Sequence, residues 1–338
     1  MRALLHAVLT SLAVATAACS HAPATPKAPT PPPAWPRPPA TARLQWDRAL
    51  PDPDRPDQRS SFRKVFDAIL GIEPGSEEPV LVRPFGLAAL PGQLLIADPD
   101  GPAVVRVVLA SAAFTPVTCE DGGWGAPMAV AAGPGGVLYV ADAGLGLVVK
   151  VGVDGHCERW GRGTLERPAA LALLGDRLYV ADPPRHAVEC FGLDGTRLAG
   201  LGNRGDGDEG FNFPTGLAAA PDGTLLVVDS LNFRVKRFRP DGSLVASFGE
   251  AGEDEGHFVR PKAVAADAGG LIYVTDTQRG QVLVFSPAGA FIYAAGEVGE
   301  LPGQFSLPAG IAVDAGALYI ADGQHRRVEA YRFIGDRS

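Results

Sequence analysis

An aspartate ends a short apolar run at six nearly regular places along the chain: Asp98, Asp142, Asp182, Asp229, Asp276 and Asp322. A proline lies 14 or 15 residues before each of them: Pro84, Pro127, Pro168, Pro214, Pro261 and Pro308. Successive aspartates are 44, 40, 47, 47 and 46 residues apart. A period in this range is typical of repeat architectures, in which each repeat is one supersecondary unit. The chain is therefore expected to consist of six copies of one unit.

The unit over residues 213–249 predicts four short strands. Asp-Gly pairs at 222–223 and 241–242 fit tight hairpin turns, which need positive φ. The first two strands are almost entirely apolar, as expected when both faces of a sheet are covered. Four such strands bury both faces only when neighbouring units pack against them, which a radial arrangement provides. We predict an all-β fold, a six-bladed β-propeller of four-stranded antiparallel blades.

The second half of the chain carries a more specific pattern. It contains Pro-Ala-Gly-Ile-Ala-Val-Asp at 308–314, Leu-Tyr-Ile-Ala-Asp at 318–322 and His-Arg-Arg-Val at 325–328. These units resemble NHL repeats of bacterial secreted or lipoprotein type, over residues 83–334. Blades would start near residues 83, 126, 167, 213, 260 and 307. The first three units lack the Asn-x-Arg element that follows the aspartate in this family.

The strand-end aspartates are interpreted as structural. A carboxylate at this position can accept backbone N–H groups of the following turn and fix the loop. Because the residue occurs in all six units, it is not read as six catalytic acids.

Closure of the ring needs a strand from elsewhere, because the last unit supplies three strands only (310–314, 317–322 and 327–333). Residues 43–50 are predicted to pair with the strand at 328–333, which would also remove an exposed edge. Between this strand and the first blade, residues 60–71 have apolar side chains at helical spacing and predict an amphipathic helix. The helix is read as a cover on one face of the propeller, with membrane or partner docking as the alternative.

The N-terminus has the features of a targeting segment. Arg2, an apolar stretch and the small residues before Cys19 resemble a bacterial lipoprotein signal over residues 1–18. The resemblance implies lipidation of Cys19 and attachment to a membrane, with Ser20 favouring the outer membrane; ordinary secretion with cleavage near Ala18 is the alternative. Residues 19–42 are rich in proline and predict an extended tether. Residues 43–82 would hold the closing strand and the helix, and the location would be the periplasm or the cell surface.

Three further cysteines, Cys119, Cys157 and Cys190, allow at most one disulfide. No C-x-x-C or C-x-x-C-H motif occurs, so the sequence gives no support to a redox motif, a zinc ribbon or covalent haem. We expect no cofactor.

Charge narrows the choice of partner. The formal net charge is −8 and no Lys/Arg stripe is present, which argues against nucleic acid. Three crossovers between blades are near copies, with paired glycines followed by Phe211, Phe258 or Phe305, read as plugs between blades. The same crossovers carry nine acidic residues: Asp206, Asp208, Glu209, Glu250, Glu253, Asp254, Glu255, Glu297 and Glu300. These form either a solvated acidic rim or a surface that recognises a basic partner.

We therefore expect a non-enzymatic, monomeric scaffold that presents propeller loops to a protein or peptide in the cell envelope. Its predicted binding residues are Asn232, Arg234, Arg279, His325 and Arg327 at the channel mouth, and Asp206, Asp208, Glu253 and Asp254 on the crossovers. A metal-dependent lyase or hydrolase acting at the central channel is the first alternative. Its only candidate metal ligands are His186 and His325, fewer than the three protein ligands normal for catalytic zinc. A receptor-like sensor subunit is the second alternative.

Overall fold

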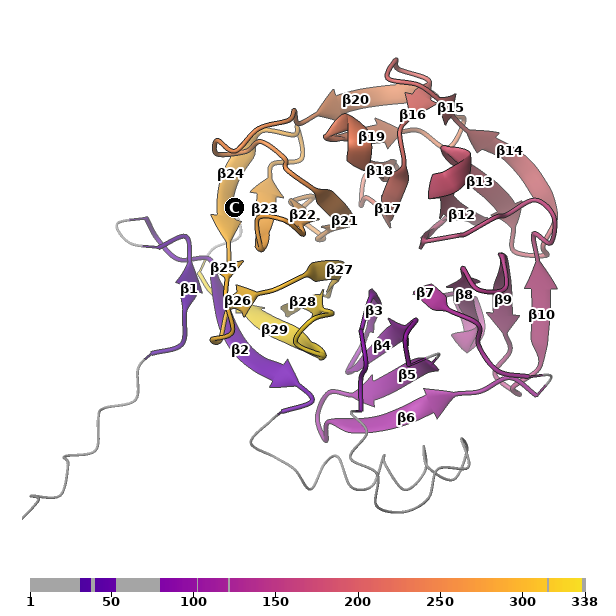
Figure 1. Ribbon diagram of the computed structural model, residues 1–338, viewed down its shortest axis with the longest axis horizontal. Helices are drawn as coiled ribbons and strands as arrows, with labels where there is room; N and C mark the ends of the chain where they lie inside the picture. Colours follow the sequence, from indigo (N-terminus) through magenta and orange to yellow (C-terminus); the bar gives the residue numbers. More distant parts are fainter. Residues whose placement is uncertain are drawn as a thin grey trace, which may run out of the picture. The chain divides into compact units, whose positions relative to one another are not determined.

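Six antiparallel sheets surround a central axis as the blades of a propeller (Figure 1). The computed structural model describes residues 31–37, 40–52, 80–101, 103–120, 122–314 and 316–335. All blades belong to one unit, Pro32–Ser338, and in each blade the first strand lies innermost. The predicted all-β, six-bladed fold is confirmed.

The first three blades follow one another without interruption. Blade one contains β3 (Gly86–Leu90), β4 (Gln93–Asp98), β5 (Ala103–Val108) and β6 (Ala113–Val117). Blade two contains β7 (Pro127–Ala132), the 3-10 turn η1 (Pro134–Gly136), β8 (Leu138–Asp142), β9 (Leu147–Val151) and β10 (Cys157–Trp160). Blade three contains β11 (Ala170–Leu174), β12 (Arg177–Asp182), the 3-10 turn η2 (Pro183–Arg185), β13 (Ala187–Gly192) and β14 (Arg197–Leu201).

A longer crossover leads into each of the last three blades. Blade four contains β17 (Pro214–Ala219), β18 (Leu225–Asp229), the 3-10 turn η3 (Ser230–Asn232), β19 (Arg234–Phe238) and β20 (Leu244–Phe248). Blade five contains β21 (Pro261–Ala266), β22 (Ile272–Asp276), β23 (Gln281–Phe285) and β24 (Phe291–Ala295). Blade six contains β27 (Pro308–Val313), β28 (Ala317–Asp322) and β29 (Arg327–Phe333). Two crossovers form small parallel ladders, β15 (Asn203–Arg204) with β16 (Gly210–Phe211), and β25 (Glu297–Val298) with β26 (Gln304–Phe305).

An N-terminal strand completes blade six. The strand β2 (Leu44–Leu50) pairs antiparallel with β29, with Leu44 opposite Phe333 and Leu50 opposite Val328. Leu44 and Leu50 are fully buried on this strand, and Trp46 Nε1 donates to Glu329 Oε2 at 2.5 Å. Burial raises the pKa of Glu329. The predicted closure of the ring by residues 43–50 is thus confirmed.

The packed domain begins earlier than the expected boundary at residue 42. The short strand β1 (Ala34–Trp35) pairs with β2 and makes this sheet five-stranded. Trp35 is 4% exposed, and its ring lies 5.8 Å from that of Tyr331. Burial of this indole fixes the end of the proline-rich segment against blade six. The packed domain therefore includes residues that the sequence assigned to the tether at 19–42. The predicted helix at 60–71 and the signal with Cys19 lie outside the described residues.

The pairing of aspartate and proline has a simple structural cause. Each strand-end aspartate accepts backbone N–H groups from the two residues that precede the repeated proline. Both of these residues donate in five blades, and one of them donates in blade four. Asp142 accepts from Gly125 (2.8 Å) and Ala126 (2.8 Å), and also from Leu145 in the following turn (3.0 Å). The carboxylate therefore ties the crossover into each blade to the end of that blade's second strand, and its main partners precede the proline rather than follow the aspartate.

Neighbouring blades approach each other closely at the axis. A Cβ atom added to Gly310 would lie 1.9 Å from the carbonyl oxygen of Phe85 in the next blade, so only glycine fits there. Thr215 Oγ1 donates to the carbonyl oxygen of Lys262 at 2.7 Å, across another blade junction. The glycine of the Pro-x-Gly pattern thus serves packing between blades.

A disulfide joins Cys119, after β6, to Cys157 at the start of β10, while Cys190 is a buried free thiol. The single disulfide agrees with the limit set by three cysteines. Within the described part of the chain, no helix is long and apolar enough to cross a membrane.

Candidate functional site

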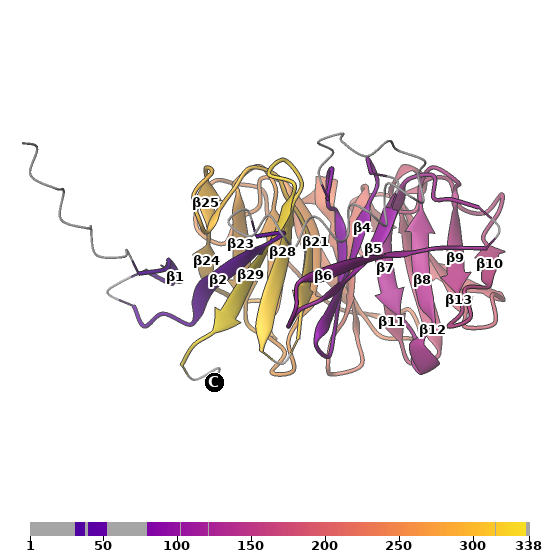
Figure 2. The same ribbon diagram turned by 90° about the horizontal axis from the view of Figure 1, so that it is seen from below.

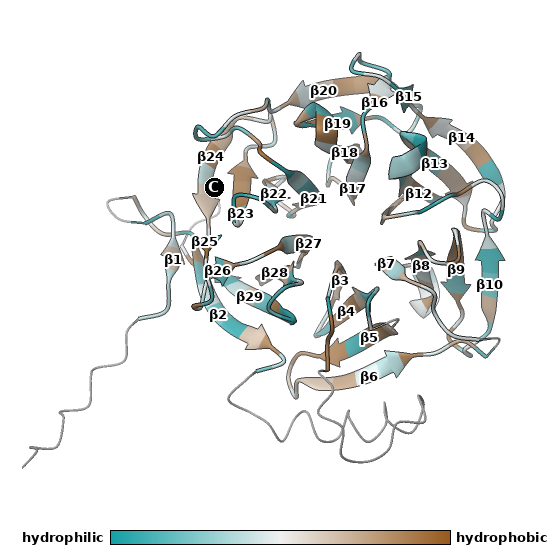
Figure 3. Cartoon of the chain, in the orientation of Figure 1, coloured by the Kyte–Doolittle hydropathy of each residue, from teal (hydrophilic) through white to brown (hydrophobic). Residues whose placement is uncertain are grey.

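One face of the ring carries the crossovers together with the turns between second and third strands. Figure 2 views the ring from the side and places the crossover ladder strand β25 at its upper edge. In the hydropathy colouring of Figure 3, the loop beside β15 is hydrophilic. We call this the crossover face; the other face holds the tight first and third turns.

Phenylalanines anchor the three long crossovers as predicted. Phe211, Phe258 and Phe305 are each 0% exposed. Their carbonyl oxygens accept from Gly205, Gly252 and Gly299, respectively, at 3.0–3.1 Å. The glycines that open these crossovers, at 202, 249 and 296, have φ of 79–92°, and a Cβ atom there would lie 2.2–2.5 Å from the plugging ring. The buried phenylalanines therefore fix the base of each crossover, and the tips of the crossovers face solvent.

The five residues predicted at the channel mouth lie instead at the turns between second and third strands, against the crossovers. Asn232 Nδ2 donates to the carbonyl oxygen of Gly205 (2.9 Å), and Arg234 pairs with Asp229 (2.9 Å). Arg279 donates to the carbonyl oxygens of Asp254 and His257, and Arg327 to that of Glu300. None of the five is among the residues that line the central channel. Four of these side chains brace the crossovers, while His325 contacts Asp322 at the end of β28, and a role in binding would be indirect.

A fifth brace is absent from the predicted site residues. Lys236 is fully buried, and its Nζ donates to the carbonyl oxygens of Gly207, Asp208 and Gly210 at 2.7–2.8 Å. Burial lowers the pKa of Lys236 to about 8, while the three carbonyl dipoles favour its ammonium form. Lys236 carries no sequence motif that would mark it, because its internal position depends on the crossover that folds over β19.

Each of the two candidate metal ligands makes a local contact of its own. His186 Nδ1 accepts the N–H of Phe213 at 3.2 Å, and His325 Nδ1 lies 2.7 Å from Asp322 Oδ2. Neither lines the channel. The described residues contain no group of three or more His, Cys, Asp or Glu side chains placed to hold a metal ion.

The predicted acidic residues all lie exposed on the crossover face. Of the nine carboxylates, Glu250 lies 2.7 Å from a His257 ring nitrogen and Glu297 pairs with Arg37 (2.9 Å); the other seven have no ion-pair partner among the described residues. Exposed apolar side chains accompany them on the same crossovers and adjoining turns: Phe213 (37% exposed), Leu231 (38%), Val298 (64%), Leu301 (66%) and Leu307 (43%). We call these fourteen residues the crossover surface. It combines apolar anchors with unpaired negative charge.

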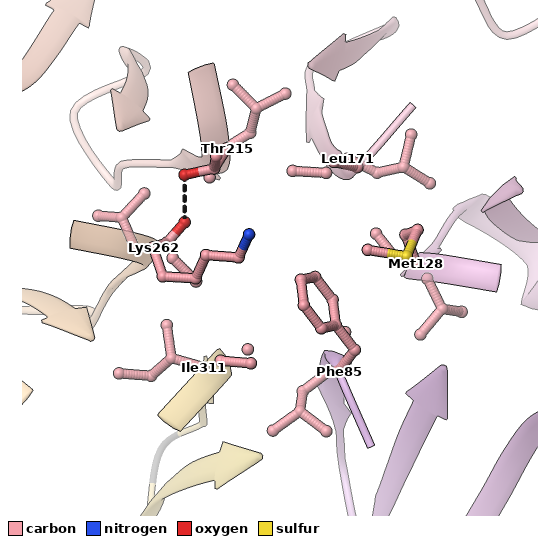
Figure 4. A pocket seen from close by; sticks show the side chains of 18 residues that line it. Phe85, Met128, Leu171, Thr215, Lys262 and Ile311 are labelled. Carbon is pink, nitrogen blue, oxygen red and sulfur yellow. Dashed lines mark hydrogen bonds between the residues drawn. The ribbon is translucent and has the colours of Figure 1, made fainter. Parts of the chain in front are cut away.

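The central channel opens on the same face. The residue after each repeated proline contributes to a ring at its mouth: Phe85, Met128, Ala169, Thr215, Lys262 and Ala309. Below this ring lie small and then aliphatic residues of the innermost strands. Figure 4 shows the Lys262 amino group directed into the cavity beside the Phe85 ring. The Nζ atom lies 4.9 Å from the centre of that ring.

Among the described residues, Lys262 is the one charged side chain that lines the cavity. Its pKa is lowered to about 8, first by burial and then by the charges of Arg260 and Arg83. The sequence analysis missed this residue, although a signal was present. Once the prolines are aligned, the following position varies between blades and only Pro261-Lys262 carries a charge there.

Comparisons with known proteins agree with the architecture. Residues 211–238 match the NHL repeat family, and residues 251–335 match a family described as a 6-bladed beta-propeller. No curated protein matches the sequence.

Solved structures with this fold include enzymes and a protein seen in a complex. A virginiamycin B lyase from Staphylococcus aureus is 16% identical, with a TM-score of 0.55 over 78% of this chain and 83% of that one. A gluconolactonase from Xanthomonas campestris is 18% identical, with a TM-score of 0.56 over 75% and 87%. A chain of a nidogen/laminin complex is 20% identical, with a TM-score of 0.54 over 63% and 80%. At these identities the likeness shows the fold alone.

Proposed function

Since the chain is an NHL-repeat six-bladed β-propeller, we propose that it is a non-enzymatic binding scaffold of the bacterial cell envelope. It would present the crossover surface to a protein or peptide that carries basic and apolar residues. Attachment to a membrane through lipidated Cys19 belongs to this proposal. The Cys119–Cys157 disulfide supports an oxidising compartment outside the cytoplasm.

The observation that carries the proposal is the composition of the crossover surface. Seven exposed carboxylates without an ion-pair partner among the described residues share the crossovers and adjoining turns with five exposed apolar side chains. A cluster of exposed apolar residues rimmed by polar ones marks interaction sites more often than inert surface. The negative charge would speed encounter with a basic partner and suppress acidic ones.

Rigid support of this surface favours a scaffold. Binding loops work best when a fixed framework positions them. Lys236, Arg279 and Arg327 each donate a hydrogen bond to a carbonyl oxygen of a different crossover and hold that crossover in place. A metal-dependent lyase or hydrolase has weaker support, because the candidate ligands His186 and His325 are engaged elsewhere than at the channel. A sensor subunit would use the same surface.

Charge reversal on the crossover surface tests the proposal. Asp206 and Glu253 are exposed and make no hydrogen bond or ion pair within the described structure, so Asp206→Lys with Glu253→Lys should fold normally. We expect this double variant to recover at least about tenfold less partner than wild type in crosslinked pull-downs from the native envelope, quantified by mass spectrometry.

The matched control is Asp176→Lys with Asp241→Lys, which reverses two exposed charges on the opposite face. It should recover the same partners as wild type. If both double variants recover equal amounts of partner, the acidic residues of the crossover surface do not recognise that partner.

A further inference from the structure

The channel mouth holds an ammonium group without a counter-charge. No carboxylate of the described residues lies within ion-pair distance of Lys262, and its Nζ lies over the ring of Phe85. The other five ring positions are Phe, Met, Ala, Thr and Ala, and the Thr215 hydroxyl is engaged with the Lys262 carbonyl oxygen. A cation placed among apolar groups is costly unless an anion or other partner joins it.

The shape of the cavity limits what can join it. Its volume is about 60 Å³. Since one water molecule needs roughly 10–15 Å³, the cavity holds a group of a few heavy atoms. Beneath the ring, the walls are made of small and aliphatic residues such as Leu171, Leu217 and Ile311. The space suits a ligand with one charged end and one short apolar end.

We propose that the channel mouth binds a small aliphatic carboxylate, with its oxygens on the Lys262 ammonium and its alkyl end among the aliphatic residues below. Arg260 and Arg83, the latter paired with Asp100 at 2.7 Å, are close enough to act on Lys262 electrostatically, and Arg260 would also attract an anion to this opening. The site is independent of the basic partner proposed for the crossover surface, because it uses a different charge and different residues.

Isothermal titration calorimetry of the full chain with propionate tests this site. We expect one propionate per chain, with a dissociation constant in the low millimolar range, as suits so small a ligand. Propionamide, which is neutral and of nearly the same shape, should bind at least about tenfold more weakly. Affinity should also fall as the pH rises above about 8, because Lys262 then loses its proton.

Substitution at the ring gives the decisive comparison. Lys262→Ala places at this position the residue that blades three and six already carry, Ala169 and Ala309, so the variant should fold. It should bind propionate at least about tenfold more weakly. Lys150→Ala, on β9 away from the channel, removes the same charge and should leave binding unchanged.

The C-terminal carboxylate of a peptide offers the same chemistry, so a second arm compares acetyl-Gly-Ala with its C-terminal amide. Tighter binding of the free peptide acid than of propionate would assign the site to chain ends, and the reverse order would assign it to free acids. The proposal would be overturned if wild type and Lys262→Ala bind propionate equally, or if propionamide binds as tightly as propionate. It would also be overturned if neither propionate nor acetyl-Gly-Ala binds.

Discussion

Replacing Leu44 and Leu50 together with alanine is expected to lower the free energy of unfolding by about 4–10 kcal/mol. Both side chains are fully buried, Leu44 beside Trp35 and Tyr331 and Leu50 at the junction of blades six and one. A buried leucine truncated to alanine costs about 2–5 kcal/mol, and the two sites lie roughly 20 Å apart along β2, so their effects should add.

Chemical denaturation followed by circular dichroism measures this effect. Because domains of this kind are stable by about 5–15 kcal/mol, the double variant should be partly or wholly unfolded without denaturant. Asp47→Ala, at an exposed position of the same strand, is the control and should change stability by less than about 1 kcal/mol. If the double variant unfolds at the same denaturant concentration as this control, the N-terminal strand does not close the ring.

Asp142→Ala is expected to cost about 3–9 kcal/mol of unfolding free energy. Asp142 is 0% exposed and accepts three backbone N–H groups, which the substitution would leave without a partner. Each buried donor without a partner costs about 1–3 kcal/mol. The same denaturation experiment applies.

Asp154→Ala provides the comparison for this second variant. Asp154 also accepts a backbone N–H, from His156 at 3.1 Å, but in an exposed turn where water can replace it. Its loss should cost less than about 1 kcal/mol. A stable Asp142→Ala variant that had lost only partner binding would mean that the strand-end aspartates are functional rather than structural.

Much of the fold could be predicted from the sequence because the repeat period and the turn chemistry are local signals. Asp-Gly pairs, apolar strands and the missing strand of blade six were enough for blade number, strand order and ring closure. The end of the packed N-terminal segment could not be predicted, because Trp35 is held by Tyr331, which lies almost 300 residues later.

The site residues were harder to predict, since they depend on what the repeats place side by side. Asn232, Arg234, Arg279 and Arg327 remain predicted binding residues, and in the structure the crossovers fold onto them and use their donors. Lys262 was missed because a single lysine carries no motif; it stands out only when the six positions after the prolines are compared as one ring.

Hydrogen–deuterium exchange of the chain, alone and with a partner recovered by crosslinking, tests most directly the claim that the crossover face binds. Slowed exchange of backbone amides at 203–210, 250–257 and 297–304 is the predicted result, with no change at the opposite turns 154–155, 194–195 and 241–242. Protection of those opposite turns with unchanged crossovers would contradict the account.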